Sequence, residues 1–152
     1  MLLKTITSVL LFFAANSLAA QITMADKADW YPVGQVKSIG TLIAKLEYSI
    51  DGSDTTYFLL MKDFKKQQEV NYFSLKFKAT GNACAQFYQL LKSFFDDNNR
   101  KNKDYMQTFT LGNAGVNLQH CTLIAKHGVR LTTREGYINL SEKDIDKLFG
   151  KR

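Results

Sequence analysis

The chain has 152 residues and a net charge of +6, with 20 basic against 14 acidic side chains. A chain of this length forms one domain with a hydrophobic core and is too short for two. Its hydrophobic content of 45% and its single proline argue against a disordered tail or a proline-rich stalk. No later segment approaches the roughly 18 apolar residues of a membrane span, so no transmembrane segment is expected.

The first residues have the three-part layout of a secretory signal peptide. Lys4 precedes the apolar run VLLFFAA, and the small residues of ANSLAA follow it. Ser17 and Ala19 place small side chains at the third and first positions before a cut after Ala19, so residues 1–19 are the expected leader. The protein is therefore predicted to be exported, either to a periplasm or to the extracellular medium.

The charge of the exported chain favours an anionic partner. Cleavage removes Lys4 and no acidic residue, which lowers the net charge from +6 to about +5. Outside the cell, such a charge suits an acidic protein or an anionic glycan or surface better than nucleic acid. No nucleic-acid partner is expected.

Residues 20–40 show no sustained hydrophobic period and contain one proline and two glycines. They are expected to form an irregular lead-in, with Trp30 and Tyr31 docked on a single globular domain over residues 41–152.

Three strands and a helix are expected next. Strict alternation over residues 41–50 predicts a half-buried strand, and the apolar run over 55–64 predicts a central strand buried on both faces. Alternation over 70–79 predicts a third strand, which completes a meander. Apolar residues then recur with helical spacing as far as Phe95, and Asn82 is the expected N-cap of this helix.

The second half of the chain predicts four strands and a closing helix. A polar loop is expected over 96–104, and the slipped alternation near His120 predicts a β-bulge there. Ser141 and Asp144 resemble a capping box at the start of the last helix. The four strands are expected over 105–111, 116–126, 129–133 and 137–140.

The element order β-β-β-α-β-β-β-β-α predicts an α+β fold. We expect an antiparallel sheet of six or seven strands with two helices packed on one face, which makes a two-layer sandwich. Each half of the chain has strands followed by a helix, so an internal duplication is a further hypothesis. Sequence identity between the halves is negligible.

The two cysteines are predicted to form a disulfide. Cys84 lies in the apolar stripe of the first helix, and Cys121 lies on a strand among apolar residues. An even cysteine count in an oxidising compartment favours pairing. Two free buried thiols are the first alternative, and a reactive thiol is the second.

No catalytic constellation stands out, and a non-enzymatic protein is expected. The best enzymatic alternative is an extracytoplasmic thiol hydrolase that uses Cys84 with His120 or His127 as its base. There is no nucleophile elbow, phosphate-binding loop or zinc-protease motif. His120, Cys121 and His127 match no common zinc spacing and lack a fourth ligand, so neither a metal nor a cofactor is predicted.

The positive functional signal is a surface. If the helices cover one face of the sheet, the other face is exposed, cationic and partly aromatic. We therefore expect a small exported binding or interaction module without a cofactor, which uses this face or adjacent turns. A carrier for a small apolar ligand, enclosed by Trp30, Tyr31 and the sheet, is a third hypothesis. The candidate binding residues are Tyr72, Lys76, Lys78, Arg130 and Arg134.

Overall fold

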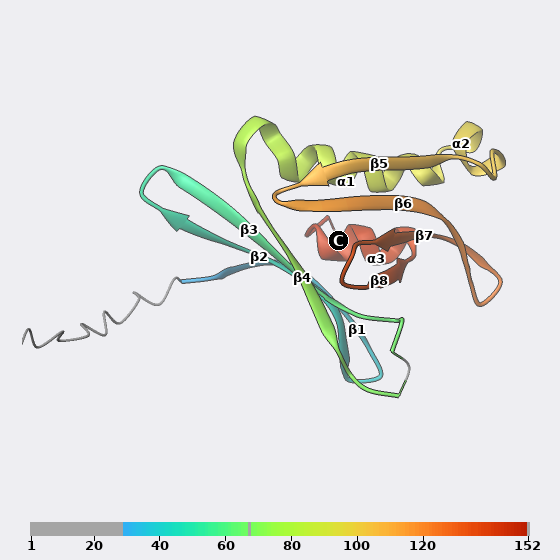
Figure 1. The fold of residues 1–152 in the computed structure, drawn as a ribbon, viewed down its shortest axis with the longest axis horizontal. Helices are drawn as coiled ribbons and strands as arrows, with labels where there is room; N and C mark the ends of the chain where they lie inside the picture. Colours follow the sequence, from blue (N-terminus) through green and yellow to red (C-terminus); the bar gives the residue numbers. More distant parts are fainter. Residues whose placement is uncertain (1–28, 67, 152) are drawn as a thin grey trace, which may run out of the picture.

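The computed structural model describes residues 29–66 and 68–151, and Figure 1 shows their arrangement. The expected signal peptide with its cut after Ala19, and the lead-in as far as residue 28, lie outside the described residues. The described chain forms an α+β fold with two antiparallel sheets of four strands each.

Each sheet is a meander that a helix follows. The first sheet contains β1 (Tyr31–Ser38), β2 (Thr41–Asp51), β3 (Asp54–Lys62) and β4 (Tyr72–Lys78), and α1 (Ala83–Lys92) comes after it. The second contains β5 (Met106–Leu111), β6 (Ala114–Leu123), β7 (Lys126–Thr132) and β8 (Tyr137–Leu140), and α3 (Glu142–Leu148) comes after it. The short helices η1 (Thr80–Asn82), η2 (Ser93–Phe95) and α2 (Asp97–Lys101) connect the halves.

The expectation of one sheet with six or seven strands is wrong. The α+β class and the antiparallel pairing are confirmed, but β4 and β5 do not pair. The chain between them contains α1, η2 and α2, and it separates two complete meanders (Figure 1). The repeated order of four strands and a helix agrees with the duplication hypothesis at the level of element order alone.

Strand β1 lies where an irregular lead-in was expected. It pairs with β2, but its register shifts between Pro32 and Gly34 and again between Val36 and Lys37. Each shift interrupts the two-residue period by which a strand is recognised. Only Val36 of this strand is buried, so its sequence shows no alternation.

Three other local expectations are wrong and one is confirmed. The expected polar loop over 96–104 contains α2, and β6 pairs with β7 in unbroken register, so there is no bulge near His120. Asn82 precedes α1 in a left-handed conformation and its side chain makes no capping hydrogen bond. The capping box of α3 is confirmed, because Ser141 and Asp144 bond each other's backbone N–H groups.

Phe87 on α1 is the centre of the core. Its side chain is almost fully buried and its ring contacts three other rings. Ring centroids lie 6.1 Å away for Phe77 of β4, 6.0 Å for Phe109 of β5 and 5.7 Å for Phe149 after α3. Helix α1 therefore joins both sheets and the C-terminal helix through one aromatic cluster.

A glycine marks a second close contact between the sheets. Gly112 lies in the β5–β6 turn with a φ of 62°, and a Cβ there would collide with the carbonyl oxygen of Lys76 on β4. This turn therefore packs backbone against backbone on the first sheet, which only glycine permits at this φ.

Candidate functional site

Three of the predicted binding residues lie on β4, where they have partners within the chain. The Lys76 ammonium lies 5.9 Å from the ring centroid of Trp30 and 5.7 Å from that of Phe58. Lys78 forms an exposed ion pair of 3.0 Å with Asp54. The hydroxyl of Tyr72 donates a hydrogen bond of 3.0 Å to the carbonyl oxygen of Leu42.

The other two predicted residues lie on the second sheet. The Nε–H of Arg130 donates to Oδ1 of Asn139 at 2.9 Å, and its guanidinium lies 4.5 Å from the ring centroid of Tyr137. Arg134 is exposed in the turn between β7 and β8. The five residues therefore do not share one sheet face, because the single sheet on which they were placed is two sheets.

The rings expected to enclose a small ligand lie on opposite faces of the first sheet. Trp30 packs on Phe58, with ring centroids 5.5 Å apart, whereas Tyr31 packs on Tyr48 at 5.4 Å. Tyr48 in turn contacts Tyr57. Tyr57 and Phe58 are consecutive on β3 and so point to opposite faces. The structure does not bring Trp30 and Tyr31 together around one cavity.

The expected disulfide is not formed, and both cysteines are free. Cys84 lies beside Tyr57 of the first sheet, and Cys121 lies near Arg130 of the second. Burial raises the pKa of the Cys84 thiol above its ordinary value, against a smaller lowering by its hydrogen bond with Tyr57. Burial likewise raises the pKa of Cys121, against a smaller lowering by Arg130. A raised pKa is the opposite of what activates a thiol.

The two histidines form a pair far from Cys84. Nδ1 of His120 lies 3.2 Å from Nε2 of His127. Nε2 of His120 lies 3.0 Å from the carbonyl oxygen of Asn99, and Nε2 of His127 lies 3.0 Å from that of Phe94. Cys84 is at the other end of α1, and ten helical residues span about 15 Å. The structure therefore does not bring together the nucleophile and the base of a thiol hydrolase.

The described residues offer neither a metal centre nor a membrane-spanning helix. Within residues 29–66 and 68–151, no group of three or more His, Cys, Asp and Glu side chains is arranged to hold a metal ion. In the same ranges, each helix is too short or too polar to cross a membrane.

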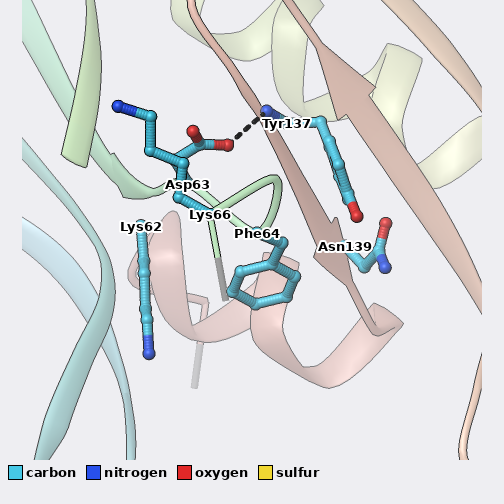
Figure 2. A pocket seen from close by; sticks show the side chains of 6 residues that line it. All are labelled: Lys62, Asp63, Phe64, Lys66, Tyr137 and Asn139. Carbon is cyan, nitrogen blue, oxygen red and sulfur yellow. Dashed lines mark hydrogen bonds between the residues drawn. The ribbon is translucent and has the colours of Figure 1, made fainter. Parts of the chain in front are cut away.

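The candidate site is a groove between the two sheets, formed by two adjoining hollows. The first hollow has a volume of about 360 Å³ and is lined by Lys62, Asp63, Phe64, Lys66, Tyr137 and Asn139, as Figure 2 shows. The second has a volume of about 590 Å³ and is lined by Val36, Lys37, Ser38, Ile43, Phe64, Leu123, Ile124, Lys126, Asn139, Ser141 and Asp144. Phe64 and Asn139 line both hollows, so we treat them as one feature, the intersheet groove.

Asp63 fixes one wall of the intersheet groove. Its buried carboxylate accepts hydrogen bonds from the backbone N–H groups of Lys65, at 2.9 Å, and Tyr137, at 3.2 Å. The second bond, drawn in Figure 2, ties the β3–β4 loop to β8. Asp63 is therefore occupied as a structural acceptor.

The intersheet groove has an apolar floor and a basic rim. The rings of Phe64 and Tyr137 meet edge to face, with centroids 6.4 Å apart. The oxygen of the Asn139 amide accepts from Arg130, so its NH₂ group is the part that can donate to a ligand. Asp144 is engaged in the capping box of α3. The lysines that line the groove are Lys37, Lys62, Lys66 and Lys126.

Sequence reasoning missed most of these residues. The turn expected at residues 126–128 lies instead at Ile124 and Ala125, which both have positive φ. Turns usually carry Gly, Asn or Asp at such positions, so an Ile-Ala pair gives no turn signal. Of the predicted binding residues, Arg130 contacts the groove lining, through Tyr137 and Asn139. Ser141 and Asp144 were predicted as a capping box and not as groove residues.

No protein-family model, curated protein or solved structure matches this chain.

Proposed function

We propose that the protein is an exported binding module that works without a cofactor and engages an anionic partner at the intersheet groove. The observation that carries the proposal is the combination of an apolar floor with a rim of four lysines, Lys37, Lys62, Lys66 and Lys126. Concave sites with apolar walls and a few placed polar groups are the usual form of binding sites. Lysines at the rim add attraction to negative charge and speed association.

The charges within the groove support an anionic partner over a cationic one. The two acidic side chains that line it, Asp63 and Asp144, accept hydrogen bonds from groups of the protein itself. Arg130 adds a further positive charge behind Tyr137 and Asn139. A carboxylate, sulfate or phosphate group in the groove would meet lysine ammonium groups and the NH₂ of Asn139. An acidic protein segment and an anionic glycan or surface share this chemistry.

Charge-matched double variants test the proposal. Lys62→Glu with Lys66→Glu reverses the groove lysines, and Lys101→Glu with Lys103→Glu makes the same change in net charge at an exposed site near α2. Binding of a sulfated polysaccharide and of polyglutamate is measured by titration at two salt concentrations. We expect the groove variant to weaken binding by about tenfold or more, and the control variant to weaken it much less.

Equal weakening by both double variants would show that only net charge matters, and the proposed site would then be wrong. Loss of the fold is monitored by circular dichroism for each variant. Lys66 is exposed and Lys62 is half-buried, and neither belongs to the hydrophobic core, so their replacement is expected to leave the core intact.

A further inference from the structure

Two hairpin turns carry isoleucine where the backbone disfavours it. Ser38 pairs with Thr41, which leaves Ile39 and Gly40 as a two-residue turn with φ values of 47° and 76°. Leu123 pairs with Lys126, which leaves Ile124 and Ala125 with φ values of 33° and 64°. Turns with two positive φ values favour Asn-Gly or Asp-Gly, and a β-branched residue there is an outlier. We call these two turns the isoleucine turns.

Neither isoleucine side chain contributes buried packing to the fold. Ile39 and Ile124 are both fully exposed, so neither is packed against the rest of the chain. Such a residue destabilises the folded state through its strained backbone, and its exposed apolar side chain gains nothing from burial. Strain of this kind is concentrated at functional sites, where a partner recovers the loss.

Both isoleucine turns lie at the mouth of the intersheet groove. The β1–β2 hairpin supplies Lys37 and Ser38 to its lining, and the β6–β7 hairpin supplies Ile124 and Lys126. In Figure 1 both hairpins point toward the lower right of the molecule. The β3–β4 loop is at the same end of the first sheet, because alternate connections of a meander lie at one end of its strands. This loop exposes Val70. We call this edge the loop end.

Lysines flank the apolar tips at the loop end. Lys37 is two residues before Ile39, and Lys126 is two residues after Ile124. The β3–β4 loop adds exposed Lys65 and Lys66. Its exposed acid, Glu69, accepts a hydrogen bond from the side chain of Asn71. The loop end therefore presents protruding aliphatic groups within a field of positive charge.

We propose that the loop end docks on an anionic lipid bilayer, with Ile39 and Ile124 inserted at the boundary between headgroups and acyl chains. This inference rests on the proposed function, because it names the anionic surface that the groove engages. Lys37 and Lys126 then lie at the headgroup level, and lipid phosphates reach the lysines of the groove. Protein interfaces bury apolar anchors together in pockets, whereas these two tips protrude from separate hairpins.

Several weak contacts act together in this geometry. Each buried CH₂ group contributes a small favourable free energy to membrane attachment, and each lysine near an anionic surface contributes a similar amount. Two isoleucines and Val70 supply the apolar part of the attachment, and the flanking lysines supply the electrostatic part. Binding is therefore expected to need anionic lipid and to fall with added salt.

Cosedimentation of the full protein with vesicles tests the inference. Mixed phosphatidylcholine–phosphatidylglycerol vesicles are compared with pure phosphatidylcholine vesicles. The decisive variant is Ile39→Asn with Ile124→Asn, because asparagine tolerates a left-handed backbone and keeps the turns folded. The matched control is Ile50→Asn, which removes an exposed isoleucine from β2 near the β2–β3 turn, at the other end of the first sheet.

We expect the wild-type protein to sediment with the anionic vesicles and not with the neutral ones. The double variant should partition at least roughly tenfold more weakly, and the Ile50→Asn control should match the wild type. Absence of sedimentation with anionic vesicles overturns the inference. So does equal sedimentation of the wild type and the double variant, since adsorption would then depend on charge alone.

The outcomes also separate this inference from the proposed function. If vesicle binding fails while the polysaccharide or polyglutamate titration still depends on Lys62 and Lys66, the groove binds an anionic partner and the bilayer is not that partner. If both assays fail, both proposals fall.

Discussion

Four two-residue hairpin turns in this molecule fall into two pairs, one with positive φ at both central positions and one with positive φ only at the first. In one pair glycine occupies the first central position with positive φ, and in the other pair isoleucine occupies it. The glycine turns are Gly52–Ser53 between β2 and β3 and Gly112–Asn113 between β5 and β6. The isoleucine turns are Ile39–Gly40 between β1 and β2 and Ile124–Ala125 between β6 and β7.

The glycine turns are explained by the stability of the fold, whereas the isoleucine turns are not. Glycine adopts positive φ at little steric cost, and at Gly112 it also permits close packing on Lys76 of β4. Isoleucine at positive φ costs roughly 1 kcal/mol or more, and here its side chain makes no compensating contact. The glycine turns therefore carry the residue that their backbone favours. The isoleucine turns carry a residue that their backbone disfavours, and they lie where the intersheet groove opens.

The largest expected effect is at the glycine turn that docks the sheets. Gly112→Ala should lower the free energy of unfolding by about 2–4 kcal/mol, because it adds both backbone strain and a collision with the Lys76 carbonyl. Denaturant unfolding measures the loss. The control is Gly52→Ala, where φ is 59° but no atom lies within 4 Å of the added Cβ, and about 1 kcal/mol is expected. Equal losses at both sites would refute the docking role of Gly112.

A gain in stability is expected at the isoleucine turns. Ile39→Asn and Ile124→Asn should each raise the free energy of unfolding by about 0.5–1 kcal/mol, since asparagine relieves strain and no buried contact is lost. The same denaturant curves report the change. The Ile50→Asn control lies in a regular strand and should show no gain. Destabilisation by either turn variant would mean that its isoleucine packs against the protein, and the turn would then not be strained without compensation.

The smallest effects are expected at the two thiols, one in each half of the chain. Alkylation of the denatured protein without reductant should add two labels by intact mass, because Cys84 and Cys121 are free. In the native protein, labelling near neutral pH should be slow and should accelerate only as pH rises above the ordinary thiol range. The reason is that burial raises both pKa values and so lowers the thiolate fraction. Fast native labelling of Cys84 would reopen the hydrolase hypothesis.

The parts of the fold that the sequence predicted are those with an uninterrupted period. Strand β4 buries Phe73, Leu75 and Phe77, as its alternation indicates, and α1 buries Phe87 and Leu91 of its apolar stripe. The capping box at Ser141 was equally readable, because both partners lie within one turn of helix. Such signals are local, so no knowledge of neighbouring elements is needed to recognise them.

The parts that the sequence did not predict depend on contacts between distant segments. Strand β1 is defined by its pairing with β2 across two register shifts, and no period survives in its own residues. The cysteines suggested a bridge, but the structure places Cys84 against the first sheet and Cys121 on the second. The number of sheets depended on whether β4 and β5 pair, which neither strand's sequence reveals.

By itself, the amino-acid sequence determined the class of the fold, the order of most elements and the buried faces of β4 and α1. It did not determine those of β3, which was expected to be buried on both faces but buries only Leu59 and Met61. The tertiary structure alone decided that there are two sheets and that a groove opens between them. The physical reason is that periodicity records which face of an element is buried, and not what buries it. The groove joins Lys62 and Phe64 to Leu123 and Asn139, residues that only the docking of the two sheets brings together.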